Sequence, residues 1–525
     1  MKPRFQSRLA AATLLLIVVS ITGVGQMIGQ LETLDFTAVE QEAYWYSRYN
    51  LGHLTMRAGM GEIFMPESEM VEAMIAIADA NPEDGDTVSP PLNPALLRTV
   101  YAGGDPLWIQ SADPADFATL RWDPASFDTR VTGAAMGWTI VKELEWAKQF
   151  HIDSHFGTPE SNFGAQWRFM GLVLTAMARM QAMEWMTMHA AESISLEDDA
   201  DPFVMLMALS NLADLVGEER LHHSESNRYY DPEASAIFLA AADTLFDEVR
   251  LIQSHRFSVK ELSIAIQGLV WYAATTLDSV RQYEAFERID ELGEELLDVR
   301  TRTAAEKGYA LRGLVELLRV RDEDEAHNEI IRLVSALEFE FDEEYGVFSS
   351  QDTYSIDDIA AIVGGLNAVR LHIEERTQRA ETLLVGFFEA AVNLSGLQQS
   401  VPPVTSGKGA FELGAPAIHY GYPGLPLPGE VGVYGVAPVF ATEVQFDRES
   451  QAWTVTDASF DTAGAMHAAN EFIWLHASQV NGFPEVERIS DPATSLLGRI
   501  TLGGIMLRLV FILVATTFVS LLVRK

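Results

Sequence analysis

His467, Glu471 and Trp474 form a group of residues whose types could do chemistry. Their i, i+4 and i+7 spacing places an imidazole, a carboxyl group and an indole on one face of a helix. Imidazole and carboxyl groups can transfer protons, and an indole can stack on a ligand. The helix is otherwise apolar, so this face lines either a cleft or a hydrogen-bonded network in the core. In a cleft, His467 and Trp474 would bind substrate.

His419 and Tyr420 are a second candidate pair. They lie in residues 396–436, a stretch that is rich in Gly and Pro and yet too hydrophobic for a disordered linker. A long structured loop over the domain fits this composition better. Because loops carry many binding residues, we predict that His419 and Tyr420 contact substrate.

Metal ligation has two weaker candidates. His151 and His155 are spaced i, i+4, as in helical metal sites, but no third ligand lies nearby in the sequence. A methionine stripe over residues 177–188 precedes His189 and could hold Cu(I), although such stripes are typical of core packing. We predict no metal site, and the sequence identifies no cofactor. The chain has no cysteine, which excludes zinc–thiolate sites, iron–sulfur clusters and thiol nucleophiles.

Long amphipathic helices must position these residues. Apolar residues recur at i, i+3, i+4 and i+7 in ten segments, and the helices come in pairs joined by short breaks. The segments are 136–151, 159–192, 201–217, 231–253, 258–278, 281–298, 302–321, 323–341, 355–375 and 377–394. Residues 31–80 also look helical, residues 439–446 and 453–456 indicate a β-hairpin, and a last helix is expected over 461–480.

Both ends of the chain are apolar. Three basic residues precede an apolar run over residues 9–25, which is typical of an export signal or a retained anchor. Residues 500–523 are apolar apart from Arg508 and are followed by Arg524 and Lys525, which predicts a transmembrane helix with a cytoplasmic C-terminus. Arg508 either snorkels outward or pairs with a membrane-protein partner.

We therefore divide the chain into six parts. They are a signal or anchor (1–30), a helical and irregular region (31–135), a helical-hairpin domain (136–395), the aromatic Gly/Pro loop with the hairpin (396–457), a closing helix with a juxtamembrane segment (458–498) and a transmembrane helix (499–525). The large domain is expected outside the cytoplasm.

The charge of the chain is strongly acidic. It has 75 acidic and 36 basic residues, a net charge of −39, and only 7 of the basic residues are lysine. An acidic excess spread along the chain, with few lysines, is typical of proteins adapted to high salt, because salt screens the self-repulsion. Such a surface argues against nucleic-acid binding, which needs clusters of Lys and Arg.

The helix rhythm resembles that of the α/α toroid proteins, in which helical hairpins form two concentric rings. The resemblance covers about half the chain, in the segments 257–278, 304–321, 341–365 and 461–476. The group includes six-hairpin glycosidases, sugar epimerases and non-catalytic relatives. It implies an all-α toroid, and a helical-hairpin solenoid would give a similar pattern.

In toroid glycosidases, acidic residues at the mouth of the inner ring perform general acid/base catalysis. The resemblance therefore implies catalytic roles for Asp357, Asp358 and Glu471, with Asp461 beside them. Capping of the helix after Ser355 also explains the two adjacent aspartates, because carboxylates are stabilised in the first helical turn.

Two functions follow from these observations. The absence of a strong catalytic motif favours a non-catalytic scaffold or assembly subunit of the cell envelope. The alternative is a carbohydrate-active or carbohydrate-binding toroid protein that acts on a glycan.

Overall fold

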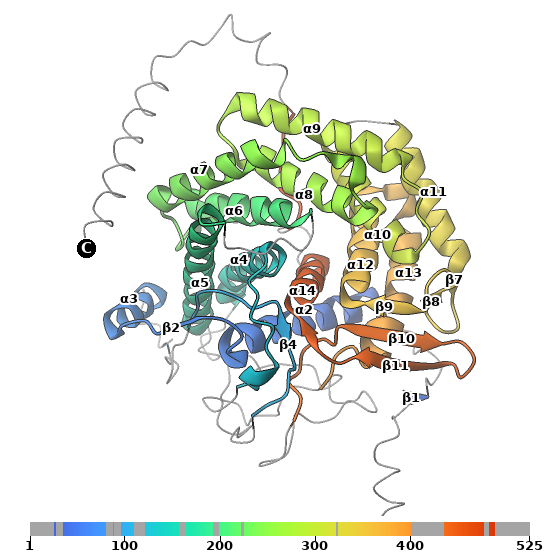
Figure 1. Cartoon of the computed structure of the whole chain (residues 1–525), viewed down its shortest axis with the longest axis horizontal. Helices are drawn as coiled ribbons and strands as arrows, with labels where there is room; N and C mark the ends of the chain where they lie inside the picture. Colours follow the sequence, from blue (N-terminus) through green and yellow to red (C-terminus); the bar gives the residue numbers. More distant parts are fainter. Residues whose placement is uncertain are drawn as a thin grey trace, which may run out of the picture.

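Two concentric rings of helices make up the body of the protein (Figure 1). The computed structural model describes residues 26–27, 35–79, 88, 96–109, 121–156, 164–192, 199–221, 225–321, 324–400, 435–476 and 482–488. Within these residues the inner helices are α4 (Gly133–Phe156), α6 (Asp201–Gly217), α8 (Val259–Thr275), α10 (Ala304–Val320), α12 (Ile356–His372) and α14 (Thr462–His476). The outer helices are α2 (Phe36–His53), α5 (Gly164–Ala190), α7 (Pro232–Val249), α9 (Ser279–Asp298), α11 (Asp324–Glu340) and α13 (Thr377–Phe388).

The contacts between the helices close the inner ring. Each inner helix packs against the next, from α4 to α14, and α14 packs back against α4. The first five inner helices each pack against the outer helix that follows them in the chain, whereas α14 packs against α2. The protein is therefore an α/α toroid. A solenoid is excluded because it would not bring its first and last helices together.

Burial differs between the two rings. The inner helices α6 and α12 bury most of their residues, because other helices pack around them. The outer helix α9 buries one stripe, which includes Ile289 and Leu292, and exposes an acidic face. This division explains why the outer helices α7, α9, α11 and α13 show clear amphipathic periodicity, while the inner helices α6 and α12 are mostly apolar or small around their circumference.

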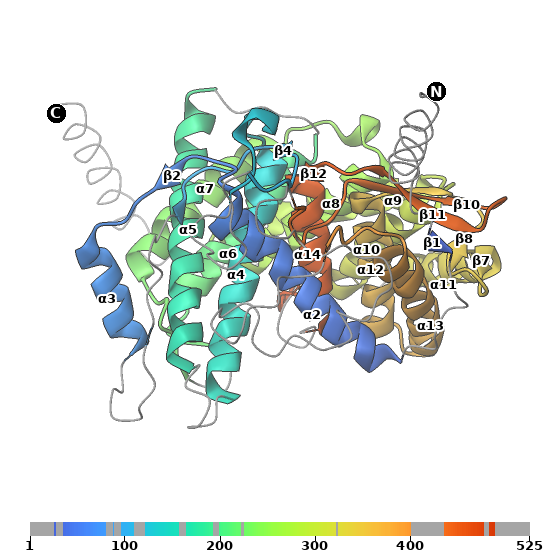
Figure 2. The same cartoon turned by 90° about the horizontal axis from the view of Figure 1, so that it is seen from below.

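Capping residues define where the inner helices begin. Ser258, Thr303 and Ser355 each form a capping box with the acidic residue three positions later, at the starts of α8, α10 and α12. Along the chain, one outer helix lies between each inner helix and the next and runs in the opposite direction. All the inner helices therefore run in the same direction and begin at one end of the ring (Figure 2). We call this end the mouth. The helix dipoles make its potential positive, which favours carboxylates there.

Short strands surround the mouth. The strands β9 (Thr353–Ser355), β10 (Glu443–Asp447), β11 (Ala452–Asp457) and β1 (Gln26–Met27) form an antiparallel sheet in the order β1-β11-β10-β9. The strand β12 (Phe460–Asp461), which leads into α14, pairs with β4 (Gly103–Gly104). The N-terminal region therefore helps to hold the start of α14 in place.

The opposite end of the ring is crossed by residues 482–488, which we call the strap. Arg312 Nη2 donates to the Gly482 carbonyl at 2.9 Å, and Arg319 Nη2 donates to the Pro484 carbonyl at 2.5 Å. The Phe483 ring centroid lies 4.1 Å from the Arg312 guanidinium. These contacts attach the strap to α10.

The predicted helices of the central domain are confirmed, with shifts of up to five residues at their ends. The expected helix over 31–80 is interrupted, because α2 passes into a π-helix (Leu54–Ala58) that ends at Gly59 with a φ of 74°. The chain then forms the short strands β2 (Ile63–Phe64) and β3 (Leu96–Leu97) and the helix α3 (Ser68–Ala78). The last predicted turns of 377–394 are a second π-helix (Glu389–Leu394). The β-hairpin is confirmed.

The apolar ends and most of the Gly/Pro loop, including His419 and Tyr420, lie outside the described residues. Among the helices that are described, none is both long and apolar enough to cross a membrane.

Two glycines allow α10 and α12 to approach closely. A Cβ at Gly365 would lie 2.2 Å from the Gly308 carbonyl oxygen, so Gly365→Ala must push the two backbones apart. We expect a loss of about 1–3 kcal/mol in the free energy of unfolding, measured by chemical denaturation. The control is Gly217→Ala, whose Cβ would meet the Ser235 hydroxyl, and rotation of this side chain gives up only its hydrogen bond to the Ala213 carbonyl. Equal stability losses in the two variants would contradict close helix packing at Gly365.

Candidate active site at the mouth of the ring

Asp357, in the first turn of α12, joins four inner helices. Its carboxylate accepts from Tyr309 Oη of α10 at 2.6 Å and from His467 Nδ1 of α14 at 2.6 Å, and it lies 2.9 Å from Lys260 Nζ of α8. Burial would raise the pKa of Asp357, but Lys260, His467 and Tyr309 together hold it well below its usual range. Asp357 is therefore ionised at neutral pH. Solvent reaches 23% of its side chain and 38% of that of Lys260.

Asp461, at the end of β12, is the second carboxyl group at the mouth. Its Oδ2 accepts from the Gly464 backbone N at 3.1 Å, as a helix cap does. A Cβ at Gly464 would lie 2.6 Å from this oxygen and 2.7 Å from Ile356, so the glycine leaves space for the carboxyl group between the starts of α14 and α12. Burial, reinforced by the negative charge of Asp357, raises the pKa of Asp461 to about 6. The two carboxyl groups are thus shifted in opposite directions.

Two aromatic rings pack on His467. The Trp138 ring stacks on the imidazole, with ring centroids 4.4 Å apart and an interplanar angle of 17°. The Tyr309 ring is also stacked, with its centroid 6.1 Å from that of the imidazole and an interplanar angle of 22°. The side chain is only 2% exposed. His467 therefore positions the Asp357 carboxylate and is not itself accessible to a substrate, in contrast to the substrate-binding role that we predicted.

Glu471 and Trp474 lie below the mouth, inside the ring. The Glu471 carboxyl group lies 3.9 Å from His467 Nε2 and 3.8 Å from Arg312 Nε, and burial raises its pKa despite Arg312. Trp474 Nε1 donates to Glu145 Oε2 at 3.1 Å. Both side chains are buried. Of the two alternatives that the sequence left open, the stripe on α14 is thus the core network and does not line an open cleft.

Asp358 acts as a helix cap. Its Oδ2 accepts from the Ser355 backbone N at 3.1 Å and from Gln351 Nε2 at 3.0 Å, while its own backbone N donates to Ser355 Oγ at 3.0 Å. This confirms the capping interpretation. The geometry brings Asp357, His467 and Glu471 together and places Asp358 in a separate set of contacts.

Sequence reasoning missed Lys260, Tyr309, Trp138 and Arg312. The sequence contains a signal for Lys260. Lys260 and Asp357 each follow a capping-box serine by two residues, so they occupy the same position in parallel helices. The four lysines of the described residues also point there: Lys142, Lys148 and Lys307 are buried, and Lys260 alone is partly exposed.

No group of three or more His, Asp or Glu side chains in the described part of the chain is arranged to hold a metal ion. His151 is buried, and the side chain of His155 lies outside the described residues.

Several solved structures are similar to this chain. An endoglucanase from the termite Nasutitermes takasagoensis has 11% identity and a TM-score of 0.42, over 85% of this chain and 100% of that one. A cellulase of C. cellulolyticum has 10% identity and a TM-score of 0.42, over 86% and 100%. An unsaturated glucuronyl hydrolase specific for heparin has 10% identity and a TM-score of 0.38, over 80% and 100%.

No protein-family model and no curated protein matches the chain. Because all three TM-scores lie below 0.5, these likenesses carry no argument about activity, and the toroid rests on the helix contacts described above.

The raised pKa of Asp461 predicts a pH-dependent stability. The folded state, with a pKa of about 6, holds the proton more tightly than the unfolded state, with a pKa near 3.8. This contribution to stability is complete below about pH 4 and is lost as the pH rises through about 6. Asp461→Asn should therefore reduce the fall in unfolding free energy over this interval. Asp447→Asn, at an exposed turn, is the control. An unchanged pH slope in Asp461→Asn would contradict the assignment.

Arg312 should be essential for stability, because it is buried with two carboxylates and a carbonyl. It lies 3.4 Å from Glu316 and 3.8 Å from Glu471, and it donates to Gly482. Arg312→Met leaves Glu471 without its arginine and Glu316 with Arg319 alone, and it should lower the unfolding free energy by about 3–5 kcal/mol. The matched control is Arg332→Met, which removes an exposed pair with Glu329 and should lower it by at most about 1 kcal/mol. Denaturant titration distinguishes them, and similar losses would contradict the buried network.

Proposed function

We propose that this protein is a carbohydrate-active enzyme that hydrolyses glycosidic bonds at the mouth of its ring. The observation that carries the proposal is the pair Asp357 and Asp461, whose pKa values are shifted in opposite directions on neighbouring helix starts. Glycoside hydrolysis uses such a pair, one carboxyl group protonated and the other ionised. Below about pH 6, Asp461 supplies the protonated carboxyl group and Asp357 supplies the ionised one.

The roles follow from the environments. Asp461 donates its proton to the oxygen of the leaving sugar as the bond from that oxygen to the anomeric carbon breaks. Water adds to the anomeric carbon and passes its proton to bulk solvent, from which the Asp461 carboxylate takes up a proton again. Asp357 is a weak base because Lys260 and Tyr309 stabilise its charge. Its role is therefore to orient the water and to stabilise positive charge on the sugar, in a geometry fixed by His467.

The scaffold function that the sequence favoured explains the mouth less well. A non-catalytic toroid needs no partly exposed Asp–Lys pair beside a carboxyl group with a raised pKa. A purely structural junction of helices would make the same contacts, however, and it would affect stability without affecting turnover. Activity measurements on variants that remain folded therefore separate the two functions.

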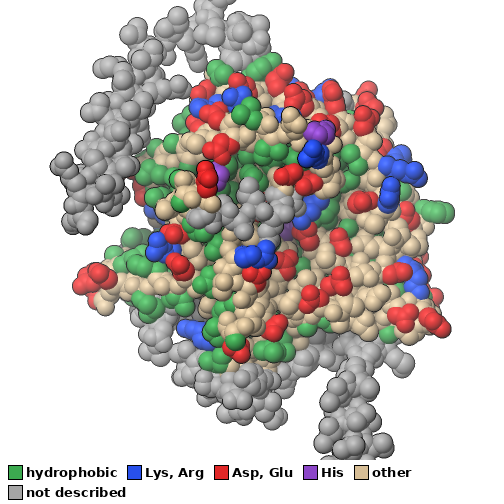
Figure 3. Space-filling model, in the orientation of Figure 1, with side chains coloured by type: hydrophobic (Ala, Val, Ile, Leu, Met, Phe, Trp, Pro, Cys, Tyr) green, Lys and Arg blue, Asp and Glu red, His purple; other side chains and the backbone are tan. Residues whose placement is uncertain are grey.

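The proposed setting is the cell envelope, with the toroid outside the cytoplasm and residues 500–523 as its membrane tether. The net charge of −39 supports a salty exterior, and acidic side chains are spread over the mouth face (Figure 3). Arg508 within the tether supports a membrane-protein partner, and an envelope glycan is the proposed substrate.

The carboxyl pair can be tested by substitution. Asp461→Asn and Asp357→Asn should each lower kcat by at least about 100-fold, as expected for loss of a general acid or of its charged partner. The neighbouring Asp358→Asn is the control and should keep kcat within a few-fold, because Asp358 only caps α12. The assay measures reducing sugar released from a panel of neutral and acidic polysaccharides, with thermal unfolding measured in parallel.

The pH profile gives a second readout. The rate should fall above about pH 6 as Asp461 loses its proton, and this limb should disappear in Asp461→Asn. Full activity in the folded Asp461→Asn variant would refute the assignment. Absence of hydrolysis across the whole panel would return the protein to the scaffold function.

A further inference from the structure

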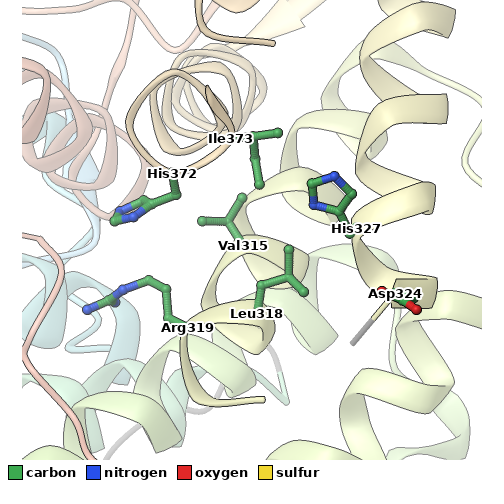
Figure 4. Close-up of a pocket in the computed structure, with 7 residues that line it drawn as sticks. All are labelled: Val315, Leu318, Arg319, Asp324, His327, His372 and Ile373. Carbon is green, nitrogen blue, oxygen red and sulfur yellow. The ribbon is translucent and has the colours of Figure 1, made fainter. Parts of the chain in front are cut away.

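A pocket of about 410 Å³ lies at the end of the ring opposite the mouth. It is formed by the last turns of α10 and α12 and the first turn of α11 (Figure 4). Val315, Leu318 and Ile373 form an apolar surface in its middle, with Arg319 and His372 on one side and Asp324 and His327 on the other. The pocket is open to solvent on one side, and its volume lies in the range of small-molecule sites.

The charges in this pocket are already compensated. Arg319 Nη1 donates to Glu316 at 2.5 Å, and its Nη2 donates to the strap. His327 Nε2 lies 2.6 Å from Glu375 Oε1. Neither side chain therefore offers an unpaired group with an unbalanced charge to a ligand.

His372 adds a neutral group. Burial, Arg319 and Arg312 together lower the pKa of His372 to about 4. The nearby Glu316 carboxylate raises this pKa, but its effect is smaller. The ring of Phe483 in the strap packs on it, with centroids 4.6 Å apart. His327 and Asp324 face it across the pocket (Figure 4). At neutral pH, His372 is an uncharged imidazole with one donor and one acceptor.

These features discriminate between classes of ligand. An anion would meet the Asp324 carboxylate and an arginine that is already paired. A metal ion is not favoured, because Asp324, His327 and His372 do not form a metal-binding group within the described chain. A neutral ligand with several hydroxyl groups can accept from Arg319 on one wall and donate to Asp324 on the other. The apolar surface between these walls can pack against its carbon atoms.

We propose that this pocket binds a short neutral saccharide, whose hydroxyl groups contact Arg319, Asp324, His327 and His372 and whose C–H face packs on Leu318. The pocket is a second site that is separate from the carboxyl pair at the mouth, and its occupancy does not depend on catalysis there. It holds a sugar without cleaving it, because its one carboxylate, Asp324, has no carboxyl partner in the lining.

Binding can be measured on the full chain by isothermal titration and saturation-transfer NMR. The neutral probes are glucose, cellobiose and maltose, and the anionic probes are glucuronate and inorganic phosphate. At least one neutral sugar should bind, and the anions should bind at least ten-fold more weakly. Leu318→Trp fills the pocket and should weaken sugar binding at least ten-fold, as should His327→Ala.

The matched control is His189→Ala. Like His327, His189 is about one-third exposed and pairs with a glutamate, Glu248, at 2.9 Å. It lies on another outer helix, so this variant should bind sugar as the wild type does. Asp461→Asn should also keep the binding, which separates this proposal from the proposed hydrolysis.

Three results would overturn the proposal. They are no binding of any neutral probe, tighter binding of glucuronate or phosphate than of the sugars, and sugar binding that survives both Leu318→Trp and His327→Ala. If binding survived in those variants and was lost in Asp461→Asn, the sugar would be bound at the mouth. The distal site would then be refuted while the proposed function stood.

Discussion

Closure of the inner ring depends on the return of α14 to α4 from the far end of the chain. Asn470 Nδ2 donates to the Trp138 carbonyl at 3.0 Å across 332 residues, and the Ser47 hydroxyl of α2 donates to the Ala469 carbonyl. The pairing of β12 with β4 holds the helix at its start. The same helix supplies His467, whose ring pairs with Asp357 of α12 and stacks on Trp138 of α4. Fold and site therefore share α14.

Basic side chains compensate buried carboxylates in the interior of this acidic chain. Lys148 pairs with Glu145, and Lys307 pairs with Glu340, each inside the body of the toroid. Buried carboxylates need such partners because an isolated charge is costly in a medium of low dielectric constant. In the described part of the chain, lysine is thus kept for the interior and for the mouth. Its partial exposure sets Lys260 apart from the other three described lysines, which are buried.

The two ends of the ring have different chemistry. At the mouth, Lys260 and His467 lower the pKa of Asp357, whereas burial and the charge of Asp357 raise the pKa of Asp461. At the opposite end, Arg319 is paired with Glu316 and His372 is neutral, so the pocket suits a polar ligand without charge. We propose proton transfer at the first end and binding alone at the second. A sugar chain is a ligand that could use both.

The sequence by itself determined the helices and much of their order. Capping residues such as Ser258 and Ser355 act within one helical turn, and amphipathic stripes are visible in any short segment, so both are local signals. The capping role of Asp358 was predictable for the same reason. Only the tertiary structure decided that Glu471 and Trp474 are core residues and that Asp357 is joined to Lys260, Tyr309 and His467. These contacts join separate helices, and only the packing of those helices sets the distances and the pKa shifts.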